Sequence, residues 1–161
     1  MHKPIKTIIN LFVDKLDKSG IGISLMQNED VYFIPYALPG ETVKANIINK
    51  FKSKVYCSNL EILKNSCERS ENTCKHFTKC GGCLLQHWEY ENYKKWKFNS
   101  IRNPLLKLRT DVKILDMISA ENYSRRRAKF FLKQGYNSCI IGFKKYRSET
   151  LTNINNCIII L

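Results

Sequence analysis

The sequence predicts a β-rich protein of mixed α+β class, made of three consecutive parts. Residues 1–65 carry short β-prone runs separated by turn residues, which is typical of a small OB-like β-barrel. Residues 66–110 contain a tight cluster of cysteines followed by helix-like sequence, which predicts a small α/β subdomain. Residues 111–161 contain further strand-like apolar runs.

The barrel is predicted from β-prone runs and the turns between them. The runs span residues 6–13, 20–25, 31–34 and 42–47. Asn28-Glu29-Asp30 suits a hairpin turn before the third run, and Pro39-Gly40 suits a turn before the fourth. A fifth strand would contain three lysines spaced two residues apart, namely Lys50, Lys52 and Lys54. At that spacing their side chains would project from one face of the strand, toward phosphate groups or simply toward solvent.

Cys74, Cys80 and Cys83 form the pattern C-x5-C-x2-C and indicate a metal centre. Iron–sulfur ligation needs several thiolates around one centre, and Gly81-Gly82 lets the backbone turn tightly with its N–H groups near sulfur. The spacing is one residue longer than that of plant-type ferredoxins, which add one distant cysteine. Zinc and free thiols remain alternatives, although no second short-spaced cysteine pair is present. The candidates for a fourth ligand are Cys57, Cys67, Cys139 and Cys157.

A helix is expected from about Glu89, with Pro104 ending or kinking it. Its aromatic residues would form an apolar lid that shields the metal centre from water, in preference to a platform for stacking bases. These aromatic residues are Trp88, Tyr93 and Trp96. His76 and His87 could ligate zinc, but packing or hydrogen-bonding roles suit them better.

The net charge of the 161-residue chain is +13, which favours a polyanionic partner, either nucleic acid or an anionic membrane surface. The apolar runs are far shorter than the roughly 20 residues that span a bilayer, so the membrane alternative is weak. Seven cysteines, an odd number, without an export signal favour reduced thiols or metal ligands in the cytoplasm over disulfides.

Three segments of the first part together resemble a known module. They are Gly20-Ile21-Gly22, Val31-Tyr32-Phe33-Ile34-Pro35 and Ala37-Leu38-Pro39-Gly40-Glu41-Thr42-Val43. In kind and order they are similar to the TRAM domain of RNA-modifying enzymes. The resemblance implies that residues 1–65 form an RNA-binding barrel.

The pattern Cys-x-His-Phe-x-x-Cys-Gly-Gly-Cys-x-Leu-Gln-His begins at Cys74 and follows the TRAM-like part. Pattern and order resemble the iron–sulfur domain of the RNA (uracil-5-)-methyltransferases that act on 23S ribosomal RNA. The resemblance implies a [4Fe–4S] cluster ligated by Cys74, Cys80, Cys83 and a distant fourth cysteine. In the family that cysteine follows a basic stretch and a Gly-Phe strand, which is the position of Cys157 here. Cys139, in an apolar strand-like run, would instead be a core residue.

Residues 111–161 would then begin the family's central RNA-binding domain, as an incomplete antiparallel sheet. Arg125, Arg126, Arg127 and Lys129 form the densest cationic cluster of the chain, and arginine both binds phosphate and stacks on exposed bases. In a strand, consecutive arginines point to both faces, so at most two could meet one RNA surface. The alternative is a charged strand face that supports the fold.

The family's S-adenosylmethionine-binding domain, with its nucleophilic cysteine and base, has no match in this sequence. No glycine-rich strand-to-helix loop with an acidic ribose partner is present, and the apolar end at residues 157–161 suggests a chain cut short. We expect an RNA-binding part of a 23S rRNA (uracil-5-)-methyltransferase that does not methylate alone. It would use S-adenosylmethionine only if a separately encoded methyltransferase domain is supplied.

Two other functions are compatible with the same residues. The chain could be a free-standing RNA-binding or regulatory protein with a structural iron–sulfur site, or a zinc-dependent nucleic-acid-binding module. Both retain the cysteine pattern and the positive charge, but neither requires a catalytic domain.

Overall fold

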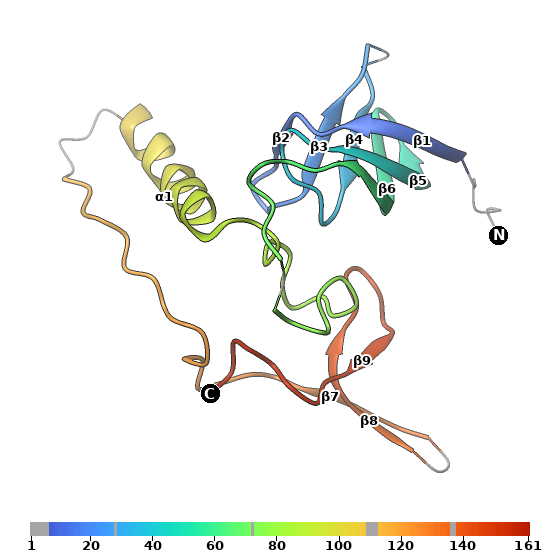
Figure 1. Cartoon of the computed structure of the whole chain (residues 1–161), viewed down its shortest axis with the longest axis vertical. Coiled ribbons are helices and arrows are strands. Elements are labelled where there is room, and N and C mark those ends of the chain that lie inside the picture. Colours follow the sequence, from blue (N-terminus) through green and yellow to red (C-terminus); the bar gives the residue numbers. More distant parts are fainter. Residues whose placement is uncertain (1–6, 28, 72, 109–112, 136–137) are drawn as a thin grey trace. The chain divides into compact units, whose positions relative to one another are not determined.

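A computed structural model describes residues 7–27, 29–71, 73–108, 113–135 and 138–161 of the chain (Figure 1). The chain divides into two compact units, Met1–Ser70 and Glu71–Leu161. Within the described residues the structure contains nine strands and a single α-helix, so the predicted β-rich character is confirmed. No helix among these residues has the length and apolar character needed to cross a membrane.

The first unit is a six-stranded sheet that curls on itself. Its strands are β1 (Thr7–Phe12), β2 (Lys15–Leu16), β3 (Gly22–Leu25), β4 (Val31–Ile34), β5 (Thr42–Phe51) and β6 (Lys54–Lys64). They lie in the order β1-β5-β6-β4-β3-β2, and all neighbours are antiparallel except β4 and β6. The two edge strands are separated in sequence by only Val13 and Asp14. The two edge strands of the curled sheet therefore belong to one continuous segment of the chain, residues 7–16.

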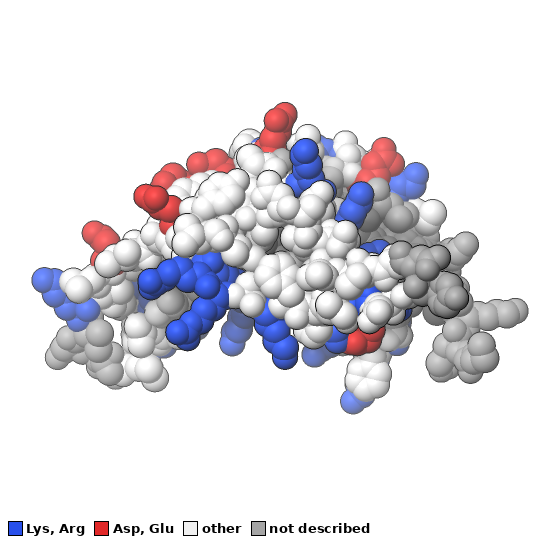
Figure 2. Space-filling model, turned by 90° about the horizontal axis from the view of Figure 1, so that it is seen from below, with Lys and Arg blue, Asp and Glu red and all other residues white. Residues whose placement is uncertain are grey.

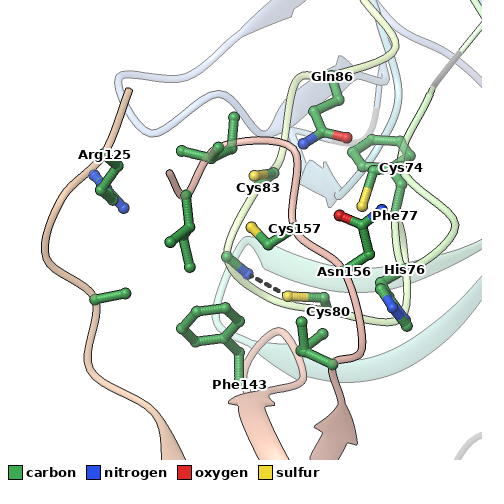
Figure 3. A pocket seen from close by; sticks show the side chains of 15 residues that line it. Cys74, His76, Phe77, Cys80, Cys83, Gln86, Arg125, Phe143, Asn156 and Cys157 are labelled. Atoms are coloured by element: carbon green, nitrogen blue, oxygen red, sulfur yellow. Dashed lines mark hydrogen bonds between the residues drawn. The ribbon is translucent and has the colours of Figure 1, made fainter. Parts of the chain in front are cut away.

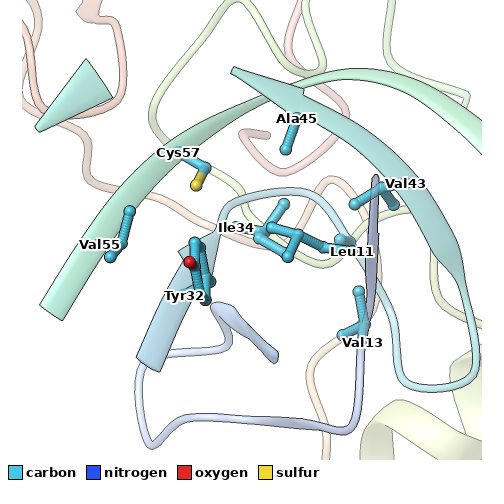
Figure 4. Packing of buried hydrophobic residues seen from close by; sticks show 9 residues of the cluster. Leu11, Val13, Tyr32, Ile34, Val43, Ala45, Val55 and Cys57 are labelled. Carbon is cyan, nitrogen blue, oxygen red and sulfur yellow. The ribbon is translucent and has the colours of Figure 1, made fainter. Parts of the chain in front are cut away.

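The concave side of this sheet holds the core of the unit (Figure 4). Val43 and Ala45 on β5 are fully buried, and Val55 and Cys57 on β6 repeat the same two-residue period. The period of two places these side chains on one face of each strand, as the alternating sequence requires. Burial raises the pKa of the Cys57 thiol to about 11. Cys57 is thus a neutral core residue.

The predicted β-runs agree with β1, β3, β4 and β5, but the prediction that Lys50, Lys52 and Lys54 share one strand is wrong. The chain reverses at Lys52, whose φ of 53° lies in the left-handed region. Lys50 belongs to the end of β5 and Lys54 begins β6. The regular spacing continues across a turn, so period alone does not distinguish one strand from a hairpin. In the predicted turn before β4, Asn28 lies outside the described residues.

A buried ion pair links the Leu-Pro-Gly-Glu segment to the chain that follows β6. The Glu41 side chain is fully buried, and its carboxylate accepts hydrogen bonds from Arg69 Nη2 at 2.8 Å and from Leu38 N at 2.8 Å. Burial acts to raise the pKa of Glu41. The hydrogen bonds and the charge of Arg69 outweigh it, so the pKa lies below its ordinary value of 4.5. The ionised form of Glu41 therefore stabilises the fold.

The second unit contains one helix and a small sheet. The helix α1 (Tyr90–Lys107) begins after Glu89, whose carboxylate accepts hydrogen bonds from the backbone N–H groups of residues 91 and 92. Pro104 lies inside the helix, so of the two predicted alternatives, an end or a kink, the end is excluded. The strands β7 (Phe131–Gln134), β8 (Cys139–Lys144) and β9 (Leu151–Asn153) form an antiparallel sheet in that order.

We predict that Glu41→Gln lowers the free energy of unfolding by about 2–4 kcal/mol, because it leaves Arg69 without its buried counter-charge. Urea titration monitored by circular dichroism measures the change. Glu61→Gln is the matched control, since Glu61 pairs with Lys44 at 3.7 Å on the surface and should contribute less than about 1 kcal/mol.

The Glu41–Arg69 pair also predicts how the stability of the fold changes at acidic pH. A lowered native pKa gives stability that is present above pH 4.5 and is lost as the pH falls through the native pKa. The difference in stability between the native chain and Glu41→Gln should therefore shrink below pH 4.5. A difference that is constant from pH 7 to pH 3 would contradict this assignment.

Candidate metal centre

All four predicted cysteine ligands line one cavity in the second unit, with a volume of about 230 Å³ (Figure 3). The sulfur atoms of Cys74, Cys80, Cys83 and Cys157 face the same central space. The first three come from the loop before α1, and the fourth comes from the segment after β9. The remaining lining is mostly apolar and includes Phe77, Phe143, Ile154, Ile159 and Ile160.

The loop carrying three of the cysteines is wound by its own backbone hydrogen bonds. Phe77 N donates to Cys74 O at 3.1 Å, and Cys80 N donates to His76 O at 2.7 Å. These turns bring Cys74 and Cys80 to the same side of the loop although five residues separate them. The Gly82 N–H then points to Cys80 Sγ at 3.4 Å, as the glycine pair predicts.

Close backbone contact fixes this loop against the end of β8. Gly81 N donates to Lys144 O at 2.9 Å. A Cβ atom on Gly81 would lie 2.7 Å from Tyr146 N and 2.8 Å from Lys144 O, closer than carbon approaches backbone atoms. The Thr152 hydroxyl adds a second connection, since it donates to Lys79 O at 2.8 Å. Gly81 is thus required by the approach of the two chain segments.

The segment after β9 brings Cys157 to the same cavity. Ile154 N donates to Ile141 O at 2.9 Å, and the Asn155 side-chain oxygen lies 2.8 Å from His76 Nε2. Beyond Cys157, Arg125 N donates to Ile159 O at 3.0 Å, and Leu161 N donates to Arg125 O at 3.1 Å. Hydrogen bonds on both sides of Cys157 therefore hold it beside the cysteine loop.

Burial in this site opposes the deprotonated, negatively charged form of its thiols. Burial raises the pKa of Cys83, and the neighbouring cysteines raise it further, whereas a hydrogen bond from Gln86 acts in the opposite direction. Burial likewise raises the pKa of Cys80, against the Gly82 N–H bond. A bound cation would remove this penalty. Soft thiolate donors select zinc, copper(I) or iron–sulfur clusters.

In the part of the chain that the structure describes, no group of three or more His, Cys, Asp or Glu side chains is arranged to hold a metal ion. The four cysteines nonetheless line one cavity, which is the geometric observation in favour of the metal centre that the sequence predicts.

Several predictions about the surroundings of the site require correction. Cys139 is on β8 but exposed, so the prediction of a core role is wrong. No residue of α1, all of which are described, lines the cavity, and the helix buries none of its side chains. Trp96 instead packs on Trp88 with ring centroids 5.9 Å apart. The predicted lid is therefore not part of the site.

The two histidines differ in their relation to the cavity. His76 lines it, whereas His87 is fully buried against Phe77, with ring centroids 5.2 Å apart. Gln86 also lines the cavity and was missed by sequence reasoning. Its position three residues after Cys83 was the available signal, since a turn would bring it back to the cysteine.

The predicted arginine strand is not a strand. Arg125 forms a single parallel bridge with Ile160, and β7 begins only at Phe131. All four basic residues of this segment are exposed, namely Arg125, Arg126, Arg127 and Lys129, and Arg125 also lines the cavity. Figure 2 shows Lys and Arg side chains spread over the visible face instead of gathered in one cluster, in a chain with 27 basic and 14 acidic residues.

No family model matches this chain. Known proteins are nevertheless similar to it in sequence over most of its length. A protein of Brucella melitensis named as an uncharacterized RNA methyltransferase is 30% identical over 145 residues, which are 90% of this chain and 34% of that protein. A 23S rRNA (uracil-C5)-methyltransferase of Shewanella denitrificans is 29% identical over 163 residues, covering 96% of this chain and 35% of that protein. The chain is a sequence relative of the RNA methyltransferases. It spans about a third of the length of these relatives.

A solved structure shows that the fold is shared as well. The tRNA (uracil-54, C5)-methyltransferase of Pyrococcus abyssi, crystallised with S-adenosyl-L-homocysteine, has a TM-score of 0.62 to this chain. The similarity covers 93% of this chain and 32% of that protein, at 20% identity. The predicted resemblance to RNA methyltransferases is confirmed by sequence, and the fold agrees with it.

We predict that Gly81→Ala lowers stability by about 1–3 kcal/mol and exposes the cysteine loop, because the added Cβ collides with backbone. The rate at which thiols react with Ellman's reagent measures the opening. It should be measured with Cys67 and Cys139 replaced by Ser, since both are exposed. Gly82→Ala is the control, because the nearest atom to its Cβ is Cys80 Sγ at 3.4 Å. Equal reactivity of the two variants would contradict the proposed role of Gly81.

Proposed function

We propose that this chain is the RNA-binding, iron–sulfur-containing part of an RNA (uracil-C5)-methyltransferase, with 23S ribosomal RNA as its substrate. The proposal rests chiefly on one observation, that four cysteines from two distant segments face a single cavity. The relatives named as RNA methyltransferases supply the enzyme class. The compartment we propose is the cytoplasm, since all seven cysteines are free thiols in the structure.

The donor chemistry of the cavity, four thiols, is the kind that an iron–sulfur cluster requires, and we propose a [4Fe–4S] cluster on that ground. Cys74, Cys80, Cys83 and Cys157 would hold it, and the surrounding phenylalanine and isoleucine side chains would limit contact with water. The Gly82 N–H bond to Cys80 and the Gln86 bond to Cys83 would stabilise thiolate charge. Ligation of iron by these thiolates would cross-link the cysteine loop to the segment after β9.

RNA binding is proposed for the remaining surface of both units. The net charge of +13 supplies attraction to phosphate, and the exposed Arg126, Arg127 and Lys129 are available for it. We assign methyl transfer and S-adenosylmethionine binding to the part of the relatives' length that this chain does not span. The residues described here contain no doubly wound parallel sheet of the kind that binds such cofactors. A domain of that kind, including a separately encoded one, would be the partner of this chain.

We predict that anaerobically purified protein is brown and contains about four iron and four sulfide per chain. Cys157→Ser should abolish the colour, because it removes the one proposed ligand that comes from outside the cysteine loop. Cys139→Ser is the matched control and should retain full iron content, since that thiol is exposed on β8. Colourless protein with one tightly bound zinc would refute the cluster.

RNA affinity should fall steeply with salt. If about four to six phosphates are contacted, log K should fall with log salt with a slope of roughly 3 to 5. Arg126→Gln should reduce this slope by about 0.7. Lys44→Gln removes the same charge but from a residue paired with Glu61, and should change the slope less. Fluorescence anisotropy with a labelled fragment of 23S rRNA, repeated at several salt concentrations, measures the slope for the unmodified chain and for each variant. Affinity that does not depend on salt would exclude the proposed mode of binding.

A further inference from the structure

The β5–β6 hairpin extends beyond the packed part of the first unit. All residues from 48 to 54, here called the hairpin tip, are exposed, whereas the next residue, Val55, is buried. Beyond the last register shift, between Ile47 and Asn49, the two strands stay paired up to Phe51 and Lys54. The hairpin tip thus adds nothing to the core of the unit.

Phe51 is the unusual residue of this tip. Its side chain is 64% exposed, although phenylalanine is among the residues most often buried. It pairs across the hairpin with Lys54, and the Lys52 ammonium lies 5.8 Å from the centre of its ring. Packing does not explain an aromatic ring that is exposed to solvent beside a lysine ammonium group.

The charges around Phe51 fall into two groups. Lys50 forms an ion pair with Asp30 at 2.6 Å, which ties the base of the tip to the start of β4. Val31 N also donates to Ser53 O at 2.7 Å, so the tip is anchored on both sides. Lys52 and Lys54, by contrast, form no ion pair with any carboxylate of the described residues. Their charges remain available to an external anion.

We propose that the hairpin tip binds an unpaired nucleotide of RNA, with Phe51 stacking on the base and Lys52 and Lys54 contacting the flanking phosphates. The inference rests on the proposed RNA-binding function and specifies its ligand as a single-stranded segment. Aromatic rings beside lysines are the combination with which proteins hold unstacked bases, since every base has a face to stack and a phosphate on either side. Lys50 positions the tip and does not contact RNA.

The test compares two labelled RNAs of equal length, one single-stranded and one fully paired, by anisotropy with the full chain. Phe51→Leu should weaken binding of the single strand by about five-fold or more and leave duplex binding within two-fold of wild type. Its salt dependence should stay unchanged, because no charge is removed. Phe51→Trp should retain affinity for the single strand. Phe12→Leu is the control, since Phe12 is 54% exposed but pairs with Thr42 at the opposite end of β5.

The lysines give a second, independent readout. Lys52→Gln and Lys54→Gln should each lower the slope of log K against log salt by about 0.7 on the single strand. Wild-type affinity of Phe51→Leu for the single strand would overturn this inference and leave the proposed RNA-binding function intact. Absence of any salt-dependent RNA binding by the unmodified chain would instead overturn the proposed function.

Discussion

The cysteine site depends on one close contact between backbones, that of Gly81 with the end of β8. The contact leaves no room for a side chain, so the loop and the strand meet at a distance that only glycine permits. The hydrogen bond from Gly81 to Lys144 fixes the relative position of the loop and the sheet. From that position the chain after β9 can return Cys157 to the loop. Three adjacent cysteines and a remote one become a single site because of this contact.

In the first unit, too, a short turn segment serves the fold. The Leu-Pro-Gly-Glu segment, read from the sequence as a mark of an RNA-binding module, has a structural role in this chain. Gly40 takes a φ of +83° to complete the turn, and Glu41 is directed inward to Arg69. The side chain that most identifies the segment is therefore fully buried.

The sequence predicts the elements whose pattern is local. The β-runs of the first unit and the helix start at Glu89 follow from alternation and capping, which act over a few residues. The convergence of Cys157 on the cysteine loop was reached by family resemblance, because spacing alone cannot place residues that lie far apart in sequence. Cys139 was misjudged as core because β8 lies in a three-stranded sheet that leaves this residue exposed. The lysine hairpin was misjudged because a two-residue turn preserves the alternation of the strands it joins.

The separation of the fourth cysteine from the others also has a consequence in time. A ribosome adding about 5–20 residues per second needs roughly 4 to 15 s to extend the chain from Cys83 to Cys157. Throughout that interval the three cysteines of the loop lack their distant partner, and until residue 144 has been added the loop also lacks β8, against which it rests. The loop is therefore synthesised before the sheet that supports it. The segment after β9, which carries Cys157, is the part whose synthesis completes the site.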